Sequence, residues 1–210
     1  MSEAKKDRKK TPGRILETAL ALFNEEGEPN ITTNHIADEM DISPGNLHYH
    51  FKSKSDIVEE LFARFDAEIS QLILAAEGRE PDVADAWLQM HVLLEAMWSY
   101  RFIYRDLAQL LSKYPSIQRK TTRLLHRKIA VTEQGCRAFG VDAQGGEADA
   151  LARNMVLVMT YWLSFELACG VGGEESDRFG RGAYQVMSML LPYLEPDARE
   201  VVHKLAGEYL

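Results

Sequence analysis

The chain has 210 residues, of which 46 % are hydrophobic, and its formal net charge is −8 at pH 7. This length suits one large or two small domains, and this composition is enough to build a substantial core. The acidic balance argues against a protein whose whole surface coats nucleic acid. Residues 1–14, however, contain six basic and two acidic residues, a local charge of +4. The overall acidity therefore does not exclude a DNA-binding end, but it predicts that the acidic remainder repels DNA and faces away from it.

Neither the cysteines nor the hydropathy of the chain indicate secretion, a membrane or a bound metal. Cys136 and Cys169 are too few and too far apart for a metal motif, and such cysteines are usually small buried hydrophobes. The N-terminus has no apolar signal segment, and no run approaches the roughly 18 apolar residues of a membrane span. The sequence predicts a cytoplasmic protein without a membrane segment or a cofactor.

Catalytic motifs are equally scarce. Glu200 and His203 have the spacing of half a di-iron carboxylate site, but a working site needs a second such pair and further facing glutamates, which the sequence does not show. The sequence has no glycine-rich phosphate loop, no Gly-x-Ser-x-Gly motif and no paired-cysteine motif. We therefore expect neither a metal site nor an enzyme.

Apolar residues recur at helical spacing from Thr11 to Glu26, which predicts an amphipathic helix that ends at Gly27. The ten residues before it are polar and charged, and we expect them to be disordered. They are either a solvated tail or a basic arm that touches phosphate or the minor groove. The helix itself is expected to support the motif that follows it.

The most informative stretch is Ile31 to Asp56, which predicts two short helices, a tight turn between them and the start of a third helix. Thr32 and Ser43 are placed to cap the first two helices through their hydroxyl oxygens. Pro44 occupies the first turn of the second helix, where its missing N–H has no cost. Asp41 lies in the turn, where a short polar side chain tolerates a left-handed backbone.

The second helix exposes more specific chemistry than a structural helix of its length usually does. Leu47 and Phe51, four residues apart, are expected to pack inward. Small, hydrogen-bonding and aromatic side chains are left at the surface, namely Gly45, Asn46, His48, Tyr49 and His50. The next helix begins with Ser53 and Asp56 at capping-box spacing. Lys52 and Lys54 lie at its start, at the height expected of a DNA phosphate backbone.

These residues resemble the DNA-reading helix-turn-helix of the TetR family of transcriptional repressors, over roughly residues 11 to 60. The matching residues are Thr32, Thr33, Ile36 and Ala37, then Ser43, Gly45, Leu47, Tyr49, Phe51, Lys52 and Lys54. Two positions depart from the family pattern. Asp41 stands where the family often has Gly, and His48 stands where Tyr is common, so an imidazole N–H would replace the phosphate contact of that position.

The resemblance implies that the first helix of the motif crosses the DNA backbone and the second enters the major groove. Asn46 is suited to hydrogen-bond a base edge, adenine being the usual partner, and Gly45 permits close backbone approach. Tyr49, His50 and Lys54 resemble the family's phosphate clamps, although a structural Tyr49 would instead pack on the first helix of the chain. The predicted DNA-binding residues are Thr32, Thr33, Ser43, Pro44, Gly45, Asn46, His48, Tyr49, His50 and Lys54.

Residues 56–77 continue as a long amphipathic helix, which would link the DNA-reading motif mechanically to the rest of the chain. Residues 78–81 mark the loop after it. A helix over residues 82–114 is apolar nearly all round, so it is expected to run through the centre of a second domain.

Polar groups within this central helix have two interpretations. His91, Glu95, Arg101 and Arg105 either form buried or half-buried ion pairs, or belong to a pocket that recognises a ligand, an anionic one included. With apolar residues of a later helix, the predicted ligand-binding set is Met90, His91, Trp98, Arg101, Arg105, Met159 and Trp162.

The last third of the chain predicts a dimerisation surface. A helix over residues 116–139 carries a basic face, with Lys128 among its members, that is expected to be solvated. Two apolar helices, at residues 147–169 and 174–193, are joined by a glycine break and form an antiparallel hairpin. Such a hairpin packs against its symmetry mate as a four-helix bundle. The predicted dimer residues are Met155, Tyr184, Met187 and Leu191, and a last short helix ends at Leu210.

Together these features predict an all-α protein with a three-helix DNA-binding domain at residues 1–55 and a helical-bundle ligand-binding and dimerisation domain at residues 56–210. The resemblance implies a homodimeric repressor that a small hydrophobic or amphipathic effector releases from a palindromic, double-stranded DNA operator. The alternative is a helical DNA-binding regulator whose second domain binds another protein and no small molecule.

Overall fold

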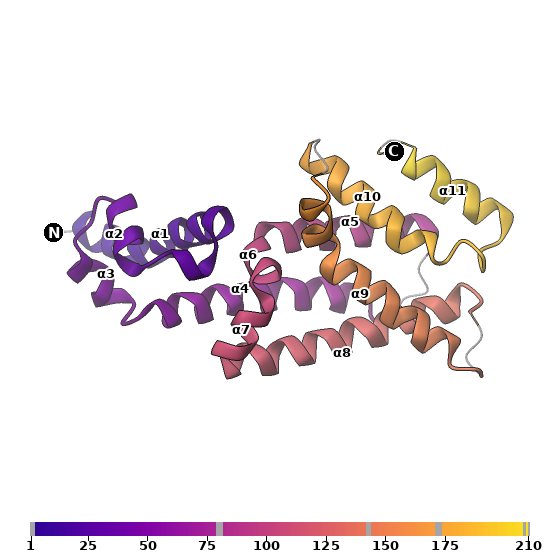
Figure 1. The fold of residues 1–210 in the computed structure, drawn as a ribbon, viewed down its shortest axis with the longest axis horizontal. Coiled ribbons are helices and arrows are strands. Elements are labelled where there is room, and N and C mark those ends of the chain that lie inside the picture. Colours follow the sequence, from indigo (N-terminus) through magenta and orange to yellow (C-terminus); the bar gives the residue numbers. More distant parts are fainter. Residues whose placement is uncertain (1–2, 79–81, 142–143, 171–173, 208, 210) are drawn as a thin grey trace. The chain divides into compact units, whose positions relative to one another are not determined.

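The computed structural model describes residues 3–78, 82–141, 144–170, 174–207 and 209, and over these residues it is helical, with no strand (Figure 1). The predicted all-α class is therefore confirmed. The loop expected at residues 79–81 and the glycine break at residues 171–173 lie outside the described residues. The elements are α1 Glu3–Glu26, η1 Glu28–Asn30, α2 Thr33–Glu39, α3 Pro44–His50, α4 Lys54–Ala76, α5 Val83–Ser99, α6 Arg101–Arg105, α7 Leu107–Lys113, α8 Pro115–Ala138, α9 Glu147–Ala168, α10 Glu175–Ser188 and α11 Pro196–Ala206.

Two compact units make up the chain. The N-terminal unit comprises Met1–Asp66 and Tyr100–Gln118, and the C-terminal unit comprises Ala67–Ser99 and Arg119–Leu210. Tyr100–Gln118, called the middle segment below, thus folds with the helix-turn-helix stretch although it lies far from it in the sequence. The two compact units do not meet at residue 55. The domain boundary predicted there concerns function, and it stays a prediction.

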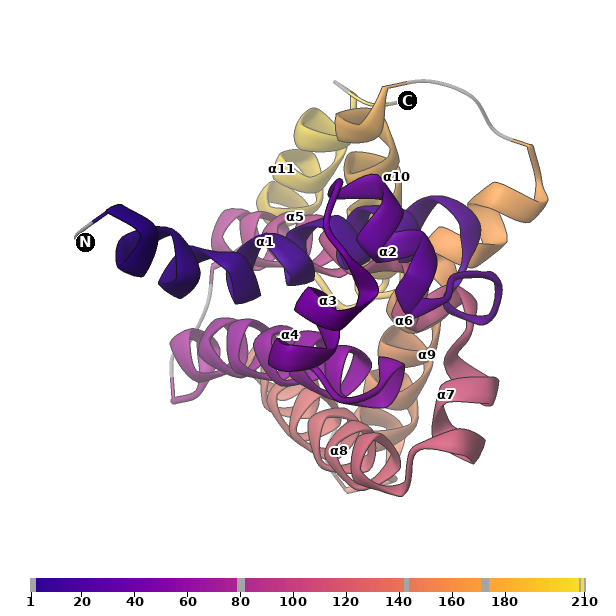
Figure 2. The same ribbon diagram turned by 90° about the vertical axis from the view of Figure 1, so that its left-hand side faces the viewer.

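The core of the N-terminal unit is built from the inner faces of α1, α2, α3 and the first half of α4 (Figure 2). Phe23, Ile36 and Leu47 are fully buried there, at the positions that helical spacing marked as inward. Phe23 also packs against Phe102 of the middle segment, with ring centroids 5.4 Å apart. That contact brings the middle segment into the same core.

The first helix is longer than its apolar pattern predicts. α1 begins at Glu3, so the expected disorder of residues 3–10 is wrong. The reason is composition: these residues are mostly Lys, Arg, Glu and Ala, which have high helix propensity even without an apolar face to bury. α1 tolerates Pro12 within its length.

The long central helix expected at residues 82–114 is broken into α5, α6 and α7. The breaks fall at Tyr100 and Asp106, whose backbone angles leave the helical region. At the first break the Phe102 N–H finds a side-chain partner far away in the sequence, since it donates to Asn24 Oδ1 at 3.1 Å. The Asp106 carboxylate in turn accepts from the Glu28 N–H at 3.0 Å. Contacts from distant residues therefore override local helical periodicity.

In the C-terminal unit, α5 packs against α10 and α11, and α10 also packs against α9. Leu94 and Met97 of α5 and Val186 of α10 are fully buried at these contacts. Among the residues that the structure describes, none of the helices has the length and hydropathy needed to cross a membrane.

Lys128 of α8 corrects the prediction of a wholly solvated basic face. Its side chain is 5 % exposed, and its ammonium lies 3.8 Å from Met97 Sδ. Lys128 follows Leu124 by one helical turn, and Leu124 is itself buried, so helical position outweighs charge here. Burial lowers the pKa of the Lys128 ammonium to about 8.

Two helical glycines, Gly135 in α8 and Gly182 in α10, have opposite surroundings. A Cβ at Gly135 would meet no atom within 4 Å beyond its own helical turns, whereas one at Gly182 would lie 2.6 Å from Trp162 Cδ1 and 2.8 Å from Leu94 Cδ1. We expect Gly135→Ala to raise the free energy of unfolding by about 0.5–1 kcal/mol, because glycine loses more backbone freedom on folding than alanine. We expect Gly182→Ala to lower it by about 1–3 kcal/mol through overpacking. Chemical denaturation measures both, and shifts of the same sign would contradict the packing described here.

Candidate nucleic-acid interface

The two short helices of the motif are capped as the sequence predicts. Thr32 Oγ1 accepts a hydrogen bond from His35 N, and Ser43 Oγ accepts one from Asn46 N, each at 3.2 Å. Asp41 in the turn has a φ of 53°, a left-handed conformation that a short polar side chain adopts more readily than most. The caps and the turn therefore fix the angle at which α3 leaves α2.

The exposed face of α3 carries the side chains that the sequence assigned to DNA. Tyr49 is 70 % exposed, so it does not pack on α1, and its ring lies edge-on to that of His50 at 5.0 Å. Asn46, Tyr49 and His50 line a groove of about 290 Å³ together with Thr11 of α1. Gly45, Asn46 and His48 are exposed, and a Cβ at Gly45 would make only an ordinary contact with Ser43 Oγ, at 3.9 Å. α3 thus presents hydrogen-bonding groups on an accessible surface, with Leu47 buried behind them.

The remaining predicted contacts of the motif lie beside this face. Thr32, Ser43 and Pro44 are exposed, and Thr33 is half-buried. The start of α4 has the predicted capping box, since Ser53 N donates to Asp56 Oδ2 at 2.9 Å and Asp56 N donates to Ser53 Oγ at 3.3 Å.

Lys54 has a different position from the one expected of a phosphate clamp. Its ammonium donates to the backbone oxygens of Glu28 and Ile31 and lies 3.1 Å from Glu28 Oε1. These acceptors hold the charge inside the N-terminal unit, so Lys54 supports the motif from behind. Lys52, two residues earlier, is exposed.

Arg101 and Arg105 do not lie where the predicted ligand pocket requires them. Both belong to α6 in the N-terminal unit. The Arg105 guanidinium donates to the backbone oxygens of Phe23, Asn24 and Glu25, and so caps the C-terminal end of α1. Sequence alone gave no signal for this role, because the partners are about eighty residues away.

A cavity of about 290 Å³ lies in the C-terminal unit, between α4, α5, α8, α9 and α10. Of the predicted ligand-binding residues, Met90 lines it. No Lys, Arg or His is among its lining residues, and its one carboxylate, Asp85, is exposed. The lining residues are Leu72, Ala75, Ala76, Asp85, Ala86, Leu88, Gln89, Met90, Val92, Val131, Thr132, Gln134, Gly135, Cys136, Phe139, Met155, Met187 and Leu190. A second cavity, of about 540 Å³, includes Ala84 and three carboxylates, Asp82, Glu195 and Asp197.

The other predicted ligand residues of this unit form a packed aromatic cluster and do not line that apolar cavity. Trp98 and His91 of α5 both contact the Phe179 ring, at 6.3 and 5.8 Å between centroids. The Arg178 guanidinium lies 4.3 Å from the centre of the Trp98 ring, and Trp162 Nε1 donates to the Arg178 backbone oxygen at 3.1 Å. Met159 is also buried, so these residues tie α5, α9 and α10 together.

The predicted dimer residues divide into two groups. Met155 and Met187 are 3 % and 1 % exposed and line the apolar cavity, so they are interior residues of one chain and not surface residues. Tyr184 and Leu191 are half-buried. A different set of apolar side chains is exposed along α9 at intervals of four residues, namely Leu157, Tyr161 and Phe165. The sequence could have indicated this exposed set, because the apolar residues of α9 lie on more than one face of the helix.

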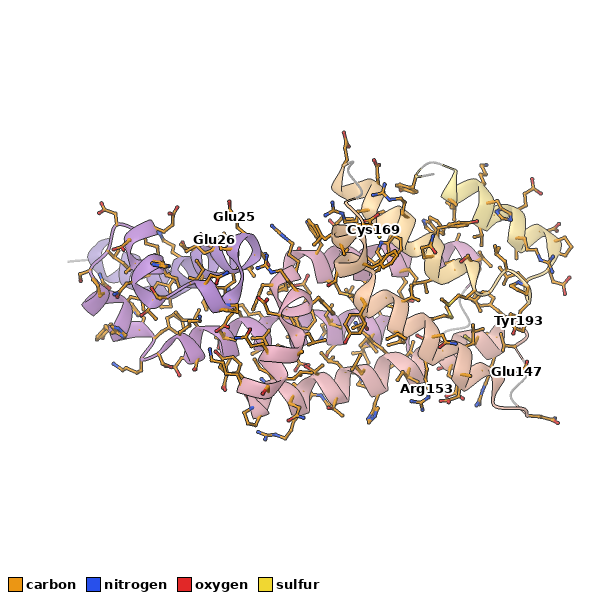
Figure 3. All side chains as sticks on the ribbon, in the orientation of Figure 1. Glu25, Glu26, Glu147, Arg153, Cys169 and Tyr193 are labelled. Carbon is orange, nitrogen blue, oxygen red and sulfur yellow. The ribbon has the colours of Figure 1, made fainter. Side chains whose placement is uncertain are left out.

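The two cysteines also differ from each other. Cys136 is buried, as expected, and burial raises the pKa of its thiol to about 11. Cys169 is exposed at the end of α9, where Figure 3 labels it, so the expectation of a buried residue is wrong there. No group of His, Cys, Asp and Glu suited to hold a metal occurs among the described residues.

Two capped helices, a fixed turn between them and an exposed second helix rich in hydrogen-bonding groups define a helix-turn-helix DNA-binding protein. Comparisons with known proteins agree with this class. A family model for the bacterial regulatory proteins of the TetR family matches residues 15–61, and one described as a bacterial transcriptional repressor matches residues 64–202. The chain belongs to the TetR family of transcriptional regulators and is not an enzyme.

Individual relatives support the same assignment. A crystal structure of a TetR-family transcriptional regulator from Marinobacter aquaeolei VT8 is 33 % identical in sequence and superposes with a TM-score of 0.84. The aligned region covers 95 % of this chain and 98 % of that chain. An HTH-type transcriptional regulator of Staphylococcus aureus strain MRSA252 is 33 % identical over 50 % of this chain and 55 % of its own length. Another, from S. aureus strain USA300, is 51 % identical over 25 % of this chain and 29 % of its own length. The chain thus matches about half, or less, of the length of these curated relatives.

Proposed function

We propose that this protein is a sequence-specific transcriptional repressor, which binds a palindromic or pseudo-palindromic operator as a homodimer and is released by a small hydrophobic or amphipathic effector. The observation that carries the DNA-binding part is the exposed face of α3, where Asn46, Tyr49 and His50 gather on a surface backed by a buried core. Such a role would place the protein in the cytoplasm.

Each residue of this interface has a proposed task. Asn46 reads a base edge, because an exposed amide pairs in a bidentate way with adenine in the major groove. Tyr49 and His50 bind phosphate and fix the register without reading sequence. The exposed N-terminal turn of α3, with Ser43, Pro44 and Gly45, allows the backbone to approach DNA closely. Thr32, Thr33 and His48 add phosphate contacts at the edges of the interface.

A homodimer follows from the size of α3. One short helix reads only a few base pairs, so useful specificity needs two copies on two half-sites. The exposed apolar stripe on α9, formed by Leu157, Tyr161 and Phe165, is the surface that we assign to the dimer contact. An apolar stripe of this kind is covered when a helix packs against its symmetry mate.

The effector site that we assign is the apolar cavity of the C-terminal unit. Its lack of basic lining residues favours an uncharged ligand over the anion that Arg101 and Arg105 suggested. Release of DNA requires that the effector bind the DNA-incompetent conformation more tightly than the DNA-bound one. The alternative, a protein partner in place of a small molecule, leaves an apolar cavity of this size without a role.

The experiment that tests the DNA-binding proposal is selection of bound duplexes from a random DNA pool at roughly physiological salt, about 0.15 M. We expect the wild type to enrich a palindrome. Tyr49→Ala should weaken binding to all duplexes by about tenfold, which corresponds to the loss of one charge-assisted contact of about 1.4 kcal/mol. Asn46→Ala should instead relax the base preference at one position in each half-site.

Tyr193→Ala serves as the matched control, because Tyr193 is also an exposed tyrosine but lies in the C-terminal unit, and it should leave binding to all duplexes unchanged. No enrichment by the wild type, or enrichment unchanged by both substitutions, would contradict the roles assigned here.

A further inference from the structure

A buried carboxylate lies at the centre of the N-terminal unit and takes no part in the proposed DNA contacts. Glu28, in η1 between α1 and α2, has a side chain that is 0 % exposed. Its Oε1 atom accepts hydrogen bonds from Lys113 Nζ at 3.1 Å and from Tyr114 Oη at 3.0 Å. Lys54 Nζ lies 3.1 Å from the same oxygen. A buried charge is stable only when it is paired, so the Glu28 carboxylate needs these partners. Through its Oε1 atom it holds all three donor groups in place.

The charge state of this group agrees with its surroundings. Burial by itself would raise the pKa of the Glu28 carboxyl, but the hydrogen bonds from Lys113, Lys54 and Tyr114 outweigh burial and hold that pKa below its ordinary value. The carboxylate is therefore ionised at neutral pH, and its hydrogen bonds are of the stronger, charge-assisted kind.

The three donors come from two parts of the N-terminal unit. Lys54 is the first residue of α4 and lies four residues after the end of α3. Lys113 and Tyr114 belong to the middle segment, Tyr100–Gln118. Glu28 is thus the point where the start of α4, and with it the end of the recognition helix, meets the middle segment.

Further polar contacts hold the middle segment to the same place. Asp106 accepts from the Glu28 N–H, Asn24 accepts from Phe102 N, and Arg105 caps the end of α1. A Cβ at Gly27, whose φ is 97°, would lie 3.1 Å from Arg105 Nη2, so the chain there passes close to this guanidinium. The end of α1 and η1 are therefore fixed by residues that follow them by about eighty positions, and the start of α4 is held to η1 by Lys54.

We propose that Glu28 is a positioning residue for DNA binding, and that Lys113 and Tyr114 set the orientation of α3 through it. This inference rests on the proposed function and adds a route for its regulation. The residues on either side of the middle segment, Ser99 and Arg119, belong to the C-terminal unit. A rearrangement of that unit can therefore pull on Lys113 and Tyr114 through the chain itself, without any group at the DNA surface being touched.

The test compares specific with non-specific DNA binding in Tyr114→Phe and Lys113→Met. Tyr114→Phe removes one hydroxyl and keeps the ring, so the fold is expected to survive. The two probes are a duplex selected by the wild type and a scrambled duplex of the same length and composition. We expect each variant to bind the selected duplex about tenfold more weakly, the scale of one lost hydrogen bond to a charged group, with binding to the scrambled duplex changed by less than about twofold.

Ser116→Ala is the matched control, because Ser116 donates to Glu59 on the exposed side of the same segment at 2.9 Å. It should leave both affinities unchanged. Thermal melting of each variant separates positioning from simple loss of stability, which would lower Tm but leave the ratio of the two affinities unaltered well below Tm. A wild-type ratio in both variants would overturn the inference and leave the proposed function standing. A wild type that does not distinguish the two duplexes would overturn both.

Discussion

Phe165→Glu should convert the protein to a monomer and weaken its binding to the selected operator by about 100-fold, because two linked reading helices gain avidity that one helix lacks. Phe165 is 59 % exposed at the end of an apolar stripe that also contains Tyr161 and Leu157. A carboxylate within a dimer contact would be buried without a partner, which is strongly unfavourable. Light scattering after gel filtration measures the mass, and fluorescence anisotropy measures the DNA affinity.

Leu74→Glu is the matched control for this experiment. Leu74 lies on α4 in the C-terminal unit, and its side chain is 54 % exposed, close to the value for Phe165. The same new charge there should change neither the mass nor the DNA affinity. A dimer that persists in Phe165→Glu, or a wild type that is already a monomer, would show that α9 is not the dimer surface.

Ala86→Phe should weaken the binding of an uncharged apolar fluorophore, N-phenyl-1-naphthylamine, to the C-terminal unit. Ala86 is 9 % exposed and lines the apolar cavity, so a larger side chain there would occupy the space that the probe needs. We expect an affinity loss of at least about tenfold, which corresponds to about 1.4 kcal/mol. Titration of the probe against wild type and variant, followed by its fluorescence increase, measures this loss.

Ala84→Phe provides the control and also tells the two cavities apart. Ala84 lies two residues from Ala86 on α5 and lines the larger, carboxylate-containing cavity instead. Unchanged probe binding in Ala84→Phe with loss in Ala86→Phe places the probe in the apolar cavity. The reverse pattern would move the effector site to the larger cavity, and loss in neither would contradict both assignments.

Local features of the helix-turn-helix were predictable because they depend on residues within about four positions of each other. The caps by Thr32 and Ser43, the left-handed Asp41 and the capping box at Ser53 are all of this kind. The exposed face of α3 follows from them, since a capped helix with one inward Leu47 leaves its other side chains outside.

The site predictions that were wrong concern residues whose contacts are made with distant parts of the sequence. Lys54 and Arg105 are charged side chains whose partners lie 23 to 82 residues away, so their spacing along the sequence did not reveal that they bind backbone oxygens. Glu28 was overlooked for the same reason, as nothing in its neighbours indicates burial. Periodicity placed Met155 and Met187 on apolar helix faces, but such a face can line a cavity or form a dimer contact equally well.

The N-terminal unit is assembled from two separate stretches of the sequence, and this has a consequence for protein engineering. A chimera that grafts residues 1–55 of this regulator onto the effector domain of a relative would leave behind Arg105, Asp106 and Tyr114, which complete the end of α1 and the environment of Glu28. A transplantable DNA-reading module has to include the middle segment, at residues 100–118, as well as the first 66 residues.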